Sequence, residues 1–407
     1  MHNLLKVGLL REGKTPPDSR VALDPSRAGK LNERPDIDIV VAPSERRTFK
    51  DTEYAEAGLK IDPDLSDRDL LLGIKEVLIE DLIPEKTYCF FSHTIKKQPY
   101  NQKLIRAVLE KRIRLIDYEV ITNKKGKRLI AFGKYAGMVG AHNGIWAYGK
   151  RTGAFKLPRL KDCYDYEAAK KEYARVDWPD IRVILTGTGR VGKGAALVLD
   201  DMGFERLTPE EYLFTPHSGP VYTQIGPEDY ANRKSDDQFN KEDFYSNPHK
   251  YEVLFEPFYE RSDVFINGIY WDPRAPAFFE VTDLRKSNFN IQTIADVTCD
   301  IAPEASVPTT LYASTIAKPV FGYDLTTGQA TEPYGDEVID VMSIDNLPSE
   351  LPRDASKAFG DMFVKHVLPE FFKADSELLL RATIAQNGQL GPHFEYLHDY
   401  AFGADLT

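Results

Sequence analysis

Cysteine is scarce in this chain and long apolar runs are missing. The 407 residues include three cysteines, Cys89, Cys163 and Cys299, which are widely spaced and form neither a CxxC pair nor a Cys/His metal pattern. This usage favours a reducing compartment, so we expect a cytoplasmic protein. Since a Cys/His pattern is lacking, we also expect no bound metal. The chain lacks an apolar run of about 18 residues, which argues against a membrane span. Its first residues also lack the basic start and cleavage site of a signal peptide.

Basic residues are outnumbered as well. Lysine and arginine total 52 against 63 aspartates and glutamates, which gives a formal net charge of −11. Because phosphate binding requires a basic surface, this balance argues against nucleic acid as a partner. An anionic small-molecule substrate remains compatible, since a few arginines suffice to make one pocket positive. The sequence carries no signal for an oligomeric state.

The order of apolar and charge-rich segments indicates an α/β protein with two Rossmann-like domains. Short apolar runs alternate with helical stretches such as 101–112, which is typical of parallel sheets flanked by helices. We expect a discontinuous first domain, 1–140 plus 345–407, a dinucleotide-binding domain, 141–344, and a cleft between them. A polar, aromatic-rich stretch at about 215–260 exceeds the usual loop length and is predicted to be an insertion with structure of its own. The predicted strands are 4–10, 37–42, 70–74, 87–91, 181–186, 263–270 and 291–297.

A glycine sequence follows the apolar run 181–186. Gly187, Gly189 and Gly192 stand between that predicted strand and a predicted helix. In this context the first glycine permits a tight turn, the second lets the main chain approach a pyrophosphate, and the third lets the helix pack on the strand. The N–H groups at the start of the helix are free to bind phosphate. The motif predicts a dinucleotide site, with an empty structural turn as the alternative.

One feature of such a site is missing. An acidic residue normally stands about 20 positions further on, at the end of the second strand, where it binds the ribose hydroxyls. The segment 204–208 is the expected second strand, and Glu210 and Glu211 follow it. These residues fit equally well a helix N-cap at Thr208 with acidic residues in the first turn. Both interpretations stay open; NAD is the expected cofactor, and NADP is not excluded.

Two titratable residues follow predicted strands of the first domain. Lys75 follows the run 70–74, and His93 comes after 87–91. Ligands of α/β sheets bind at the carboxyl ends of strands, where a partly buried lysine can act as a base and a histidine titrates near neutrality. Arg20 and Arg128 are candidates for binding carboxylates bidentately. Taken singly, each of the four is explained more simply as a solvated or structural side chain. Because Lys75 and His93 both follow a strand, a functional interpretation of the two together is as good as the structural one.

These residues lie in longer segments that resemble a known family. The opening, with Arg11-Glu12 and 20–25, is similar to the start of the alanine dehydrogenase and transhydrogenase superfamily. More closely, the chain resembles lysine-forming saccharopine dehydrogenase in the same order along 5–370, through the segments 73–76, 91–93, 131–137 and 343–353. The resemblance implies an NAD-dependent oxidoreductase that reversibly cleaves saccharopine to lysine and 2-oxoglutarate. The chain departs from that family at Thr208-Pro209, where an aspartate is usual, and in the length of 215–260.

The resemblance also implies roles for individual residues. Lys75 and His93 would form the acid–base pair, with Lys75 taking the amine proton and His93 handling the protons of the water steps. Substrate contacts would come from Arg20, Gln98, Arg128, Phe132 and Asp300, and Glu76 and Glu119 would tune the pair at the substrate site. The implied cofactor contacts are Gly187, Gly189, Arg190, Val191, Gly192, Tyr270, Val297, Ile344, Asp345 and Leu347.

Two other functions fit parts of the pattern. Another amino-acid or opine dehydrogenase, such as an alanine dehydrogenase, would use the same Lys/His pair and need fewer arginines. The presence of both Arg20 and Arg128 favours the larger dicarboxylate substrate. A non-catalytic nucleotide-binding sensor would explain the missing ribose acid and the long insertion. Such a sensor has no use for Lys75, His93 and Arg128 together.

Overall fold

The chain folds into two compact units, each built on one large and mainly parallel sheet. The structure is a computed structural model that describes residues 4–13, 15–75 and 77–405. Unit 1 comprises Met1–Phe132 with Pro352–Thr407, and unit 2 comprises Gly133–Leu351. The chain passes between the units where two helices begin, α4 (Gly133–Thr152) and α11 (Pro352–His366). Both units are α/β with helices on the faces of the sheet, which confirms the predicted fold class.

The sheet of unit 1 has the strand order β18-β17-β6-β5-β4-β1-β2-β3. The six strands from β6 to β3 are parallel, and β17 joins β6 in the antiparallel sense. The chain runs outward from β1 in both directions, so that β1 and β4 flank the point where the strand order reverses. The strands are β1 (Leu5–Leu9), β2 (Ile37–Val41), β3 (Lys60–Ile61), β4 (Leu70–Leu72), β5 (Thr87–Phe90), β6 (Arg114–Asp117), β17 (Thr383–Gln386) and β18 (Gln389–Leu390).

Helices cover both faces of this sheet. One face packs against α1 (Pro25–Asn32), α2 (Asp51–Glu56), α11 and α12 (Glu377–Ala382), and the other against α3 (Gln102–Glu110) and α13 (His398–Phe402). Each helix presents apolar residues to one face of a sheet whose strands alternate in side-chain direction. Asp24 begins α1 by accepting a hydrogen bond from the main-chain N–H of Arg27, with Pro25 in the first turn.

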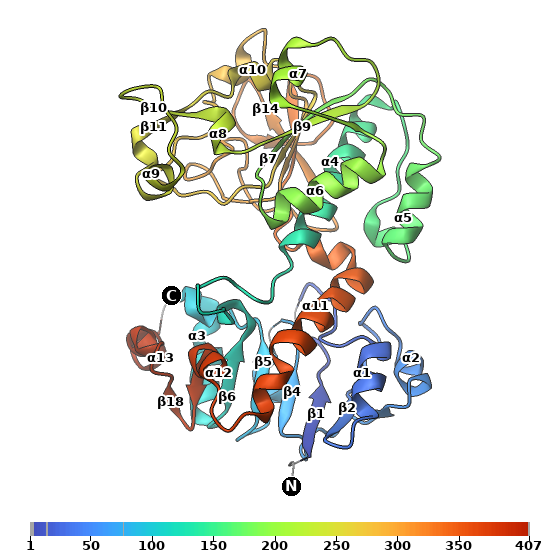
Figure 1. Ribbon diagram of the computed structural model, residues 1–407, viewed down its shortest axis with the longest axis vertical. Helices are drawn as coiled ribbons and strands as arrows, with labels where there is room; N and C mark the ends of the chain where they lie inside the picture. The colour runs from blue at the N-terminus through green and yellow to red at the C-terminus, as the bar shows by residue number, and fades with distance from the viewer. Residues whose placement is uncertain (1–3, 14, 76, 406–407) are drawn as a thin grey trace. The chain divides into compact units, whose positions relative to one another are not determined.

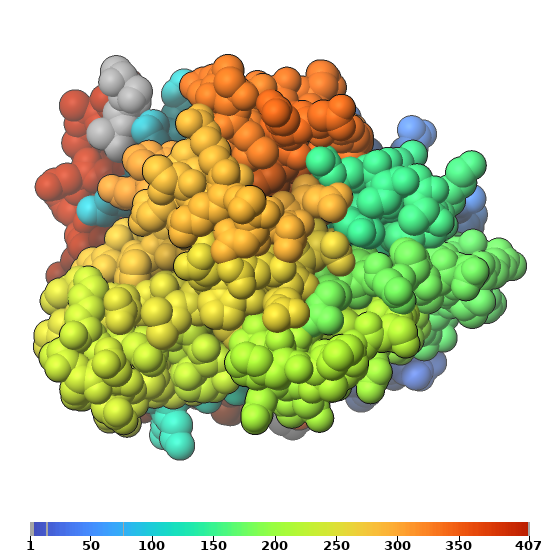
Figure 2. Space-filling view, turned by 90° about the horizontal axis from the view of Figure 1, so that it is seen from above, coloured from blue at the N-terminus to red at the C-terminus, as the bar shows by residue number. Residues whose placement is uncertain are grey.

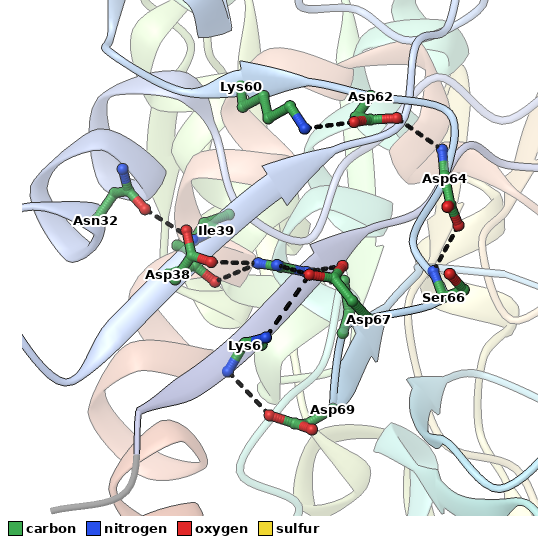
Figure 3. Close-up of polar contacts among 11 residues, drawn as sticks. Lys6, Asn32, Asp38, Ile39, Lys60, Asp62, Asp64, Ser66, Asp67 and Asp69 are labelled. Carbon is green, nitrogen blue, oxygen red and sulfur yellow. Dashed lines mark hydrogen bonds and ion pairs between the residues drawn. The ribbon is translucent and has the colours of Figure 1, made fainter.

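Ion pairs hold the amino ends of the central strands of unit 1 together (Figure 3). Arg68, just before β4, donates to Asp38 on β2 at 2.6 Å and to Asp67 at 2.7 Å. Lys6 on β1 donates its main-chain N–H to Asp69 at 3.2 Å, and its ammonium lies 3.7 Å from Asp67. These contacts fix the strands at one edge of the sheet. The opposite edge, at the carboxyl ends, carries the residues that the sequence singled out.

The sheet of unit 2 has the order β15-β14-β16-β13-β12-β7-β9-β8. The strands from β16 to β8 are parallel, and β14 and β15 extend the sheet in the antiparallel sense. Chain order reverses between β7 and β12, which is where Rossmann-like sheets bind ligands. The strands are β7 (Arg182–Thr186), β8 (Glu205–Leu207), β9 (Val221–Ile225), β12 (Val264–Asn267), β13 (Thr293–Asp296), β14 (Val320–Asp324), β15 (Ala330–Thr331) and β16 (Val338–Met342).

The helices of unit 2 also form two layers. One face of the sheet carries α4, α5 (Tyr166–Tyr173) and α6 (Arg190–Asp201), and the other carries α7 (Pro209–Phe214), α8 (Pro227–Tyr230), α9 (Lys241–Ser246) and α10 (Glu256–Tyr259). Helices α4 and α6 pack at backbone distance. A Cβ placed on Gly137 would lie 1.9 Å from the carbonyl oxygen of Val191, and one on Gly194 would lie 2.0 Å from that of Lys134. This close approach requires glycine at both positions.

The stretch predicted as an insertion, 215–260, divides into two parts. Residues 221–225 form β9, which pairs with β7 and therefore belongs to the main sheet. The later part forms a separate two-stranded sheet, β10 (Ala231–Arg233) with β11 (Tyr251–Val253), around α9. Figure 2 shows this small subdomain, in yellow-green, on the face of unit 2 that is in view. The insertion is thus shorter than the sequence suggested, because the polar residues around β9 made this strand of the main sheet hard to predict.

Candidate functional site

Four adjacent strand ends of unit 1 bring the predicted acid–base residues to one edge. Strands β1, β4, β5 and β6 are neighbours and parallel, with Leu9 opposite Leu72 and Phe90 opposite Asp117. The residues that follow each strand therefore emerge side by side. Glu12 follows β1, Lys75 follows β4 and His93 follows β5.

The turn that carries Lys75 is anchored by a carboxylate from the neighbouring strand end. The two oxygens of Glu12 accept the main-chain N–H groups of Ile74 at 2.6 Å and of Lys75 at 2.8 Å. Burial raises the pKa of Glu12 to about 7 and the charge of Asp18 adds to it, although the two main-chain N–H groups oppose the shift. The ammonium of Lys75 lies 5.8 Å from the centre of the Phe91 ring. Glu12 thus holds the main chain from which the lysine projects.

A second buried carboxylate sets the position of His93. Asp117 accepts hydrogen bonds from the main-chain N–H of Ser92 at 2.9 Å and from its hydroxyl at 2.5 Å. The other oxygen of Asp117 accepts the N–H of Glu119 at 2.7 Å. His93 itself has a φ of 55°, a left-handed conformation that is uncommon for residues other than glycine. Burial raises the pKa of Asp117. One side chain therefore links the turns that carry His93 and Glu119.

Arg20 packs against aromatic side chains next to these strand ends. Its guanidinium is buried and pairs with Asp18, through Nε at 3.0 Å and Nη2 at 2.6 Å. The guanidinium carbon lies 4.2 Å from the centre of the Phe132 ring, and that ring stands 5.9 Å from Phe91. Two cations, Arg20 and Lys75, therefore lie against neighbouring rings. The ion pair makes Arg20 a fixed positive charge instead of a mobile surface arginine.

The remaining predicted substrate residues of unit 1 are placed as follows. Glu119 lies between two cations, with one carboxylate oxygen 3.7 Å from both Lys96 and Arg128. Its other oxygen is buried and accepts no hydrogen bond from the part of the chain that the structure describes. The side chain of Gln98 accepts a hydrogen bond from the hydroxyl of Tyr100 at 2.7 Å. Glu76 lies outside the described residues.

The glycine sequence forms the turn from β7 into α6, as its spacing predicts. Gly187 has a φ of 95°, which a residue with a side chain rarely adopts. A Cβ on Gly192 would lie 1.8 Å from the carbonyl oxygen of Gly187, so only glycine allows α6 to start this close to the strand. Thr188, Gly189 and Arg190 are exposed, and a Cβ on Gly189 would meet no atom within 4 Å. The turn thus presents N–H groups to open space, which fits a pyrophosphate.

The other predicted cofactor residues lie in unit 2 at the carboxyl ends of neighbouring strands. Tyr270 comes after β12 and is exposed, and Val297 comes after β13 and packs against Gly140. After β16, Asp345 is exposed, whereas Ile344 and Leu347 are buried in the core and can reach a ligand only through their main chain. Asp300, predicted to contact substrate, follows Val297, and burial raises its pKa.

An apolar pocket adjoins the strand ends of unit 2. Its walls come from the segment after β9, the segment after β12 and the small subdomain around α9. The lining residues are Tyr230, Phe244, Tyr245, Pro248, Val253, Ile269, Tyr270, Trp271, Asp272, Ala275, Pro276 and Phe278. The small subdomain therefore borders the edge of the sheet that carries the glycine turn.

The expected position of the ribose acid needs correction. Glu211 accepts the main-chain N–H of Thr208 at 2.9 Å, and Thr208 in turn caps α7, so the helix-cap interpretation of this segment holds. Strand β8 lies at the edge of the sheet, and β9 separates it from β7. The strand next to the glycine turn is therefore β9, and the residues after it are Gly226, Pro227 and Glu228.

Sequence reasoning missed Glu12, Asp117 and Glu228. Glu12 lies in a segment that the sequence marks only through the family resemblance. Its hydrogen bond to the turn of Lys75 joins residues far apart in the sequence. Asp117 ends the apolar run that forms β6. A carboxylate in that position was a usable sequence signal for a buried residue at the end of a strand. Within the described ranges, His, Cys, Asp and Glu side chains form no group placed to hold a metal ion. The helices described there are also too short or too polar to cross a membrane.

Comparisons with known proteins agree with this geometry. Residues 8–139 match the family model described as alanine dehydrogenase/PNT, N-terminal domain. Alpha-aminoadipic semialdehyde synthase of Arabidopsis thaliana is 31% identical over 96% of this chain and 41% of its own length. Saccharopine dehydrogenase [NAD(+), L-lysine-forming] of Schizosaccharomyces pombe is 26% identical over 88% of this chain and 91% of its own. The chain spans less than half the length of the semialdehyde synthases that it matches.

Solved structures show the same fold. An L-alanine dehydrogenase superposes with a TM-score of 0.67 at 17% identity, covering 98% of this chain and all of its own. The transhydrogenase from Sinorhizobium meliloti has a TM-score of 0.60 at 15% identity and covers 95% of this chain and 99% of its own. Residues 8–139 are thus similar to the alanine dehydrogenase/PNT N-terminal domain, and the chain as a whole is similar to the lysine-forming saccharopine dehydrogenases.

Proposed function

We propose that this protein is an NAD-dependent oxidoreductase that reversibly converts saccharopine and water to lysine and 2-oxoglutarate. The observation that carries the proposal is the placement of Lys75 and His93 at the ends of adjacent parallel strands, each on a turn anchored by a buried carboxylate. The similarity to proteins named saccharopine dehydrogenase supports the choice of substrate.

The glycine turn suits the pyrophosphate of NAD, because Gly189 leaves space above the exposed N–H groups of the first turn of α6. Arg190 and Val191 belong to the same turn, and Tyr270, Val297 and the main chain at 344–347 would complete the cofactor site. NAD, when bound, supplies the acceptor for the hydride that leaves the substrate carbon. Three cysteines without disulfide bonds suit the reducing cytoplasm that we also propose as its compartment.

In the reaction, Lys75 accepts the proton of the secondary amine as the C–H bond breaks and the imine forms. His93 then takes a proton from the attacking water and returns one to the departing lysine amine. Both groups act from turns whose main chains are fixed by Glu12 and Asp117, which preserves the geometry that proton transfer requires. Glu119 has one buried oxygen without a hydrogen bond from the described residues, and it would tune the charge of the pair.

Substrate carboxylates would be bound by Arg20 and Arg128, and Gln98, Phe132 and Asp300 would supply the other substrate contacts. Arg20 is held by Asp18 and Phe132, so its charge is presented in one orientation. Arg128 is half-exposed and close to Glu119. Two arginines match a substrate with several carboxylates better than they match alanine.

Alanine dehydrogenase activity is the second candidate, favoured by the match of 8–139 to the alanine dehydrogenase/PNT family and by the shared fold. Steady-state NADH oxidation separates the two. We expect turnover with lysine plus 2-oxoglutarate and none with pyruvate plus ammonia. Turnover with pyruvate plus ammonia alone would replace the proposal with the second candidate. Cofactor binding without turnover on either pair would contradict both and favour a sensor.

A further inference from the structure

We propose that Glu228 selects NAD(H) over NADP(H) by accepting hydrogen bonds from the hydroxyls of the adenosine ribose. The inference rests on the dinucleotide site proposed above and adds its specificity. The ribose acid of a Rossmann-like domain follows the strand beside the glycine turn. That strand is β9, because Thr186 at the end of β7 is opposite Ile225 at the end of β9.

Main-chain and side-chain contacts join the end of β9 to the glycine turn. The N–H of Gly187 donates to the carbonyl oxygen of Ile225 at 2.9 Å. The side-chain amide of Gln224 donates to the carbonyl oxygen of Gly187 at 2.8 Å. Strands β7 and β9 are paired neighbours in the sheet of unit 2 (Figure 1), so the segment that begins at Gly226 leaves the sheet directly beside the turn.

Two carboxylates, those of Glu228 and Asp229, follow Gly226 in the chain, and only that of Glu228 is available to bind a ribose hydroxyl. Asp229 accepts the main-chain N–H of Gly226 at 2.8 Å and so closes the first turn of α8. Glu228 is exposed and makes no hydrogen bond or ion pair with the described residues. Its carboxylate is folded over the end of the strand, since a Cβ on Gly226 would lie 2.7 Å from its carboxyl atoms. Gly226 leaves the room that this orientation of Glu228 requires.

A carboxylate here discriminates between the two cofactors by charge. It accepts hydrogen bonds from ribose hydroxyls but repels the additional phosphate of NADP. The competing positive group is Arg206 on β8, whose guanidinium donates to Gln224 at 2.7 Å. Arg206 is the residue that would attract the phosphate once the charge of Glu228 is gone.

The earlier candidates, Glu210 and Glu211, lie on α7 after the edge strand β8. Glu211 is engaged by Thr208, and Glu210 is exposed in the first turn of the same helix. Glu210 therefore serves as a matched control, because its substitution removes the same charge from the same domain without touching the end of β9.

The test is a fluorescence titration of the purified full chain with NADH and with NADPH, without amino-acid substrate. We expect the unaltered protein to bind NADH at least about tenfold more tightly than NADPH, since hydrogen bonds to a charged group are worth about that factor or more. Glu228→Gln should weaken NADH binding and tighten NADPH binding, so that the preference falls about tenfold or more. Glu210→Gln should leave both dissociation constants unchanged.

Adding Arg206→Gln to Glu228→Gln should remove the gain in NADPH binding, which assigns that gain to the guanidinium. An unchanged NADH/NADPH ratio in Glu228→Gln would overturn the inference and leave the proposed reaction untouched. A preference of the unaltered protein for NADPH would overturn it as well. Failure to bind either nucleotide would overturn the dinucleotide site itself, and the inference with it.

Discussion

Replacing Gly189 by alanine should separate cofactor binding from folding. The main chain at Gly189 has φ −80° and ψ −157°, which alanine adopts without strain. A Cβ there would meet no atom within 4 Å, so the folded protein accommodates the methyl group. Because alanine also restricts the unfolded chain, we expect the free energy of unfolding to stay equal or to rise by up to about 1 kcal/mol.

Cofactor binding should respond in the opposite way. The space above Gly189 is where the pyrophosphate would approach the N–H groups at the start of α6, and the new methyl group would occupy it. Loss of one hydrogen bond to a charged group costs about 1.5–3 kcal/mol, which corresponds to a dissociation constant about tenfold to a hundredfold higher. Titration with NADH and urea unfolding measure the two quantities on one preparation.

Gly192→Ala is the contrasting variant. Its Cβ would lie 1.8 Å from the carbonyl oxygen of Gly187, so α6 must move away from β7 and stability must fall along with binding. An unchanged NADH affinity in Gly189→Ala would refute the assignment of this turn to the pyrophosphate. A clear loss of stability in the same variant would refute the geometry from which the argument starts.

The remaining predictions concern packing, pH and positioning. Gly137→Ala should destabilise unit 2 by about 1–3 kcal/mol or more, because its Cβ would lie 1.9 Å from the carbonyl oxygen of Val191; urea unfolding checks this, and full stability would contradict the close packing of α4 on α6. Burial raises the pKa of Glu12 from 4.5 to about 7, so the folded protein binds this proton more tightly than the unfolded chain and loses up to about 3 kcal/mol of stability as pH rises through that window. Glu12→Gln should remove that slope, and parallel stability–pH curves for the two proteins would disprove it. Asp117→Asn turns an acceptor of the Ser92 N–H into a potential donor, so turnover should fall about tenfold or more with NADH binding intact; unaltered turnover would show that His93 needs no such anchor.

The parts of the site that follow local rules could be predicted from the sequence. The glycine turn was found because Gly187 and Gly192 meet steric demands that only the strand-to-helix turn imposes. Lys75 and His93 could be placed together because the carboxyl ends of parallel strands share one edge. Each of these inferences needs only a short segment and its secondary structure.

The parts that depend on distant pairing could not be predicted. Strand β8 follows α6 directly and was the natural second strand, yet β9 takes the place beside β7 because its side chains, Val221 and Tyr222 among them, are buried on both faces of the sheet. Pairing of this kind is set by tertiary packing and leaves little trace in the local pattern. Likewise, the anchoring of the Lys75 turn by Glu12 spans 63 residues and had no local signature.

The central claim is that Lys75 acts on a substrate proton and not on cofactor binding. The direct measurement is turnover and NADH affinity of Lys75→Met, assayed with lysine plus 2-oxoglutarate beside the unaltered protein. General base catalysis contributes about a hundredfold to ten-thousandfold, so we expect turnover to fall by that range while the NADH dissociation constant stays the same. Turnover equal to that of the unaltered protein would contradict the account.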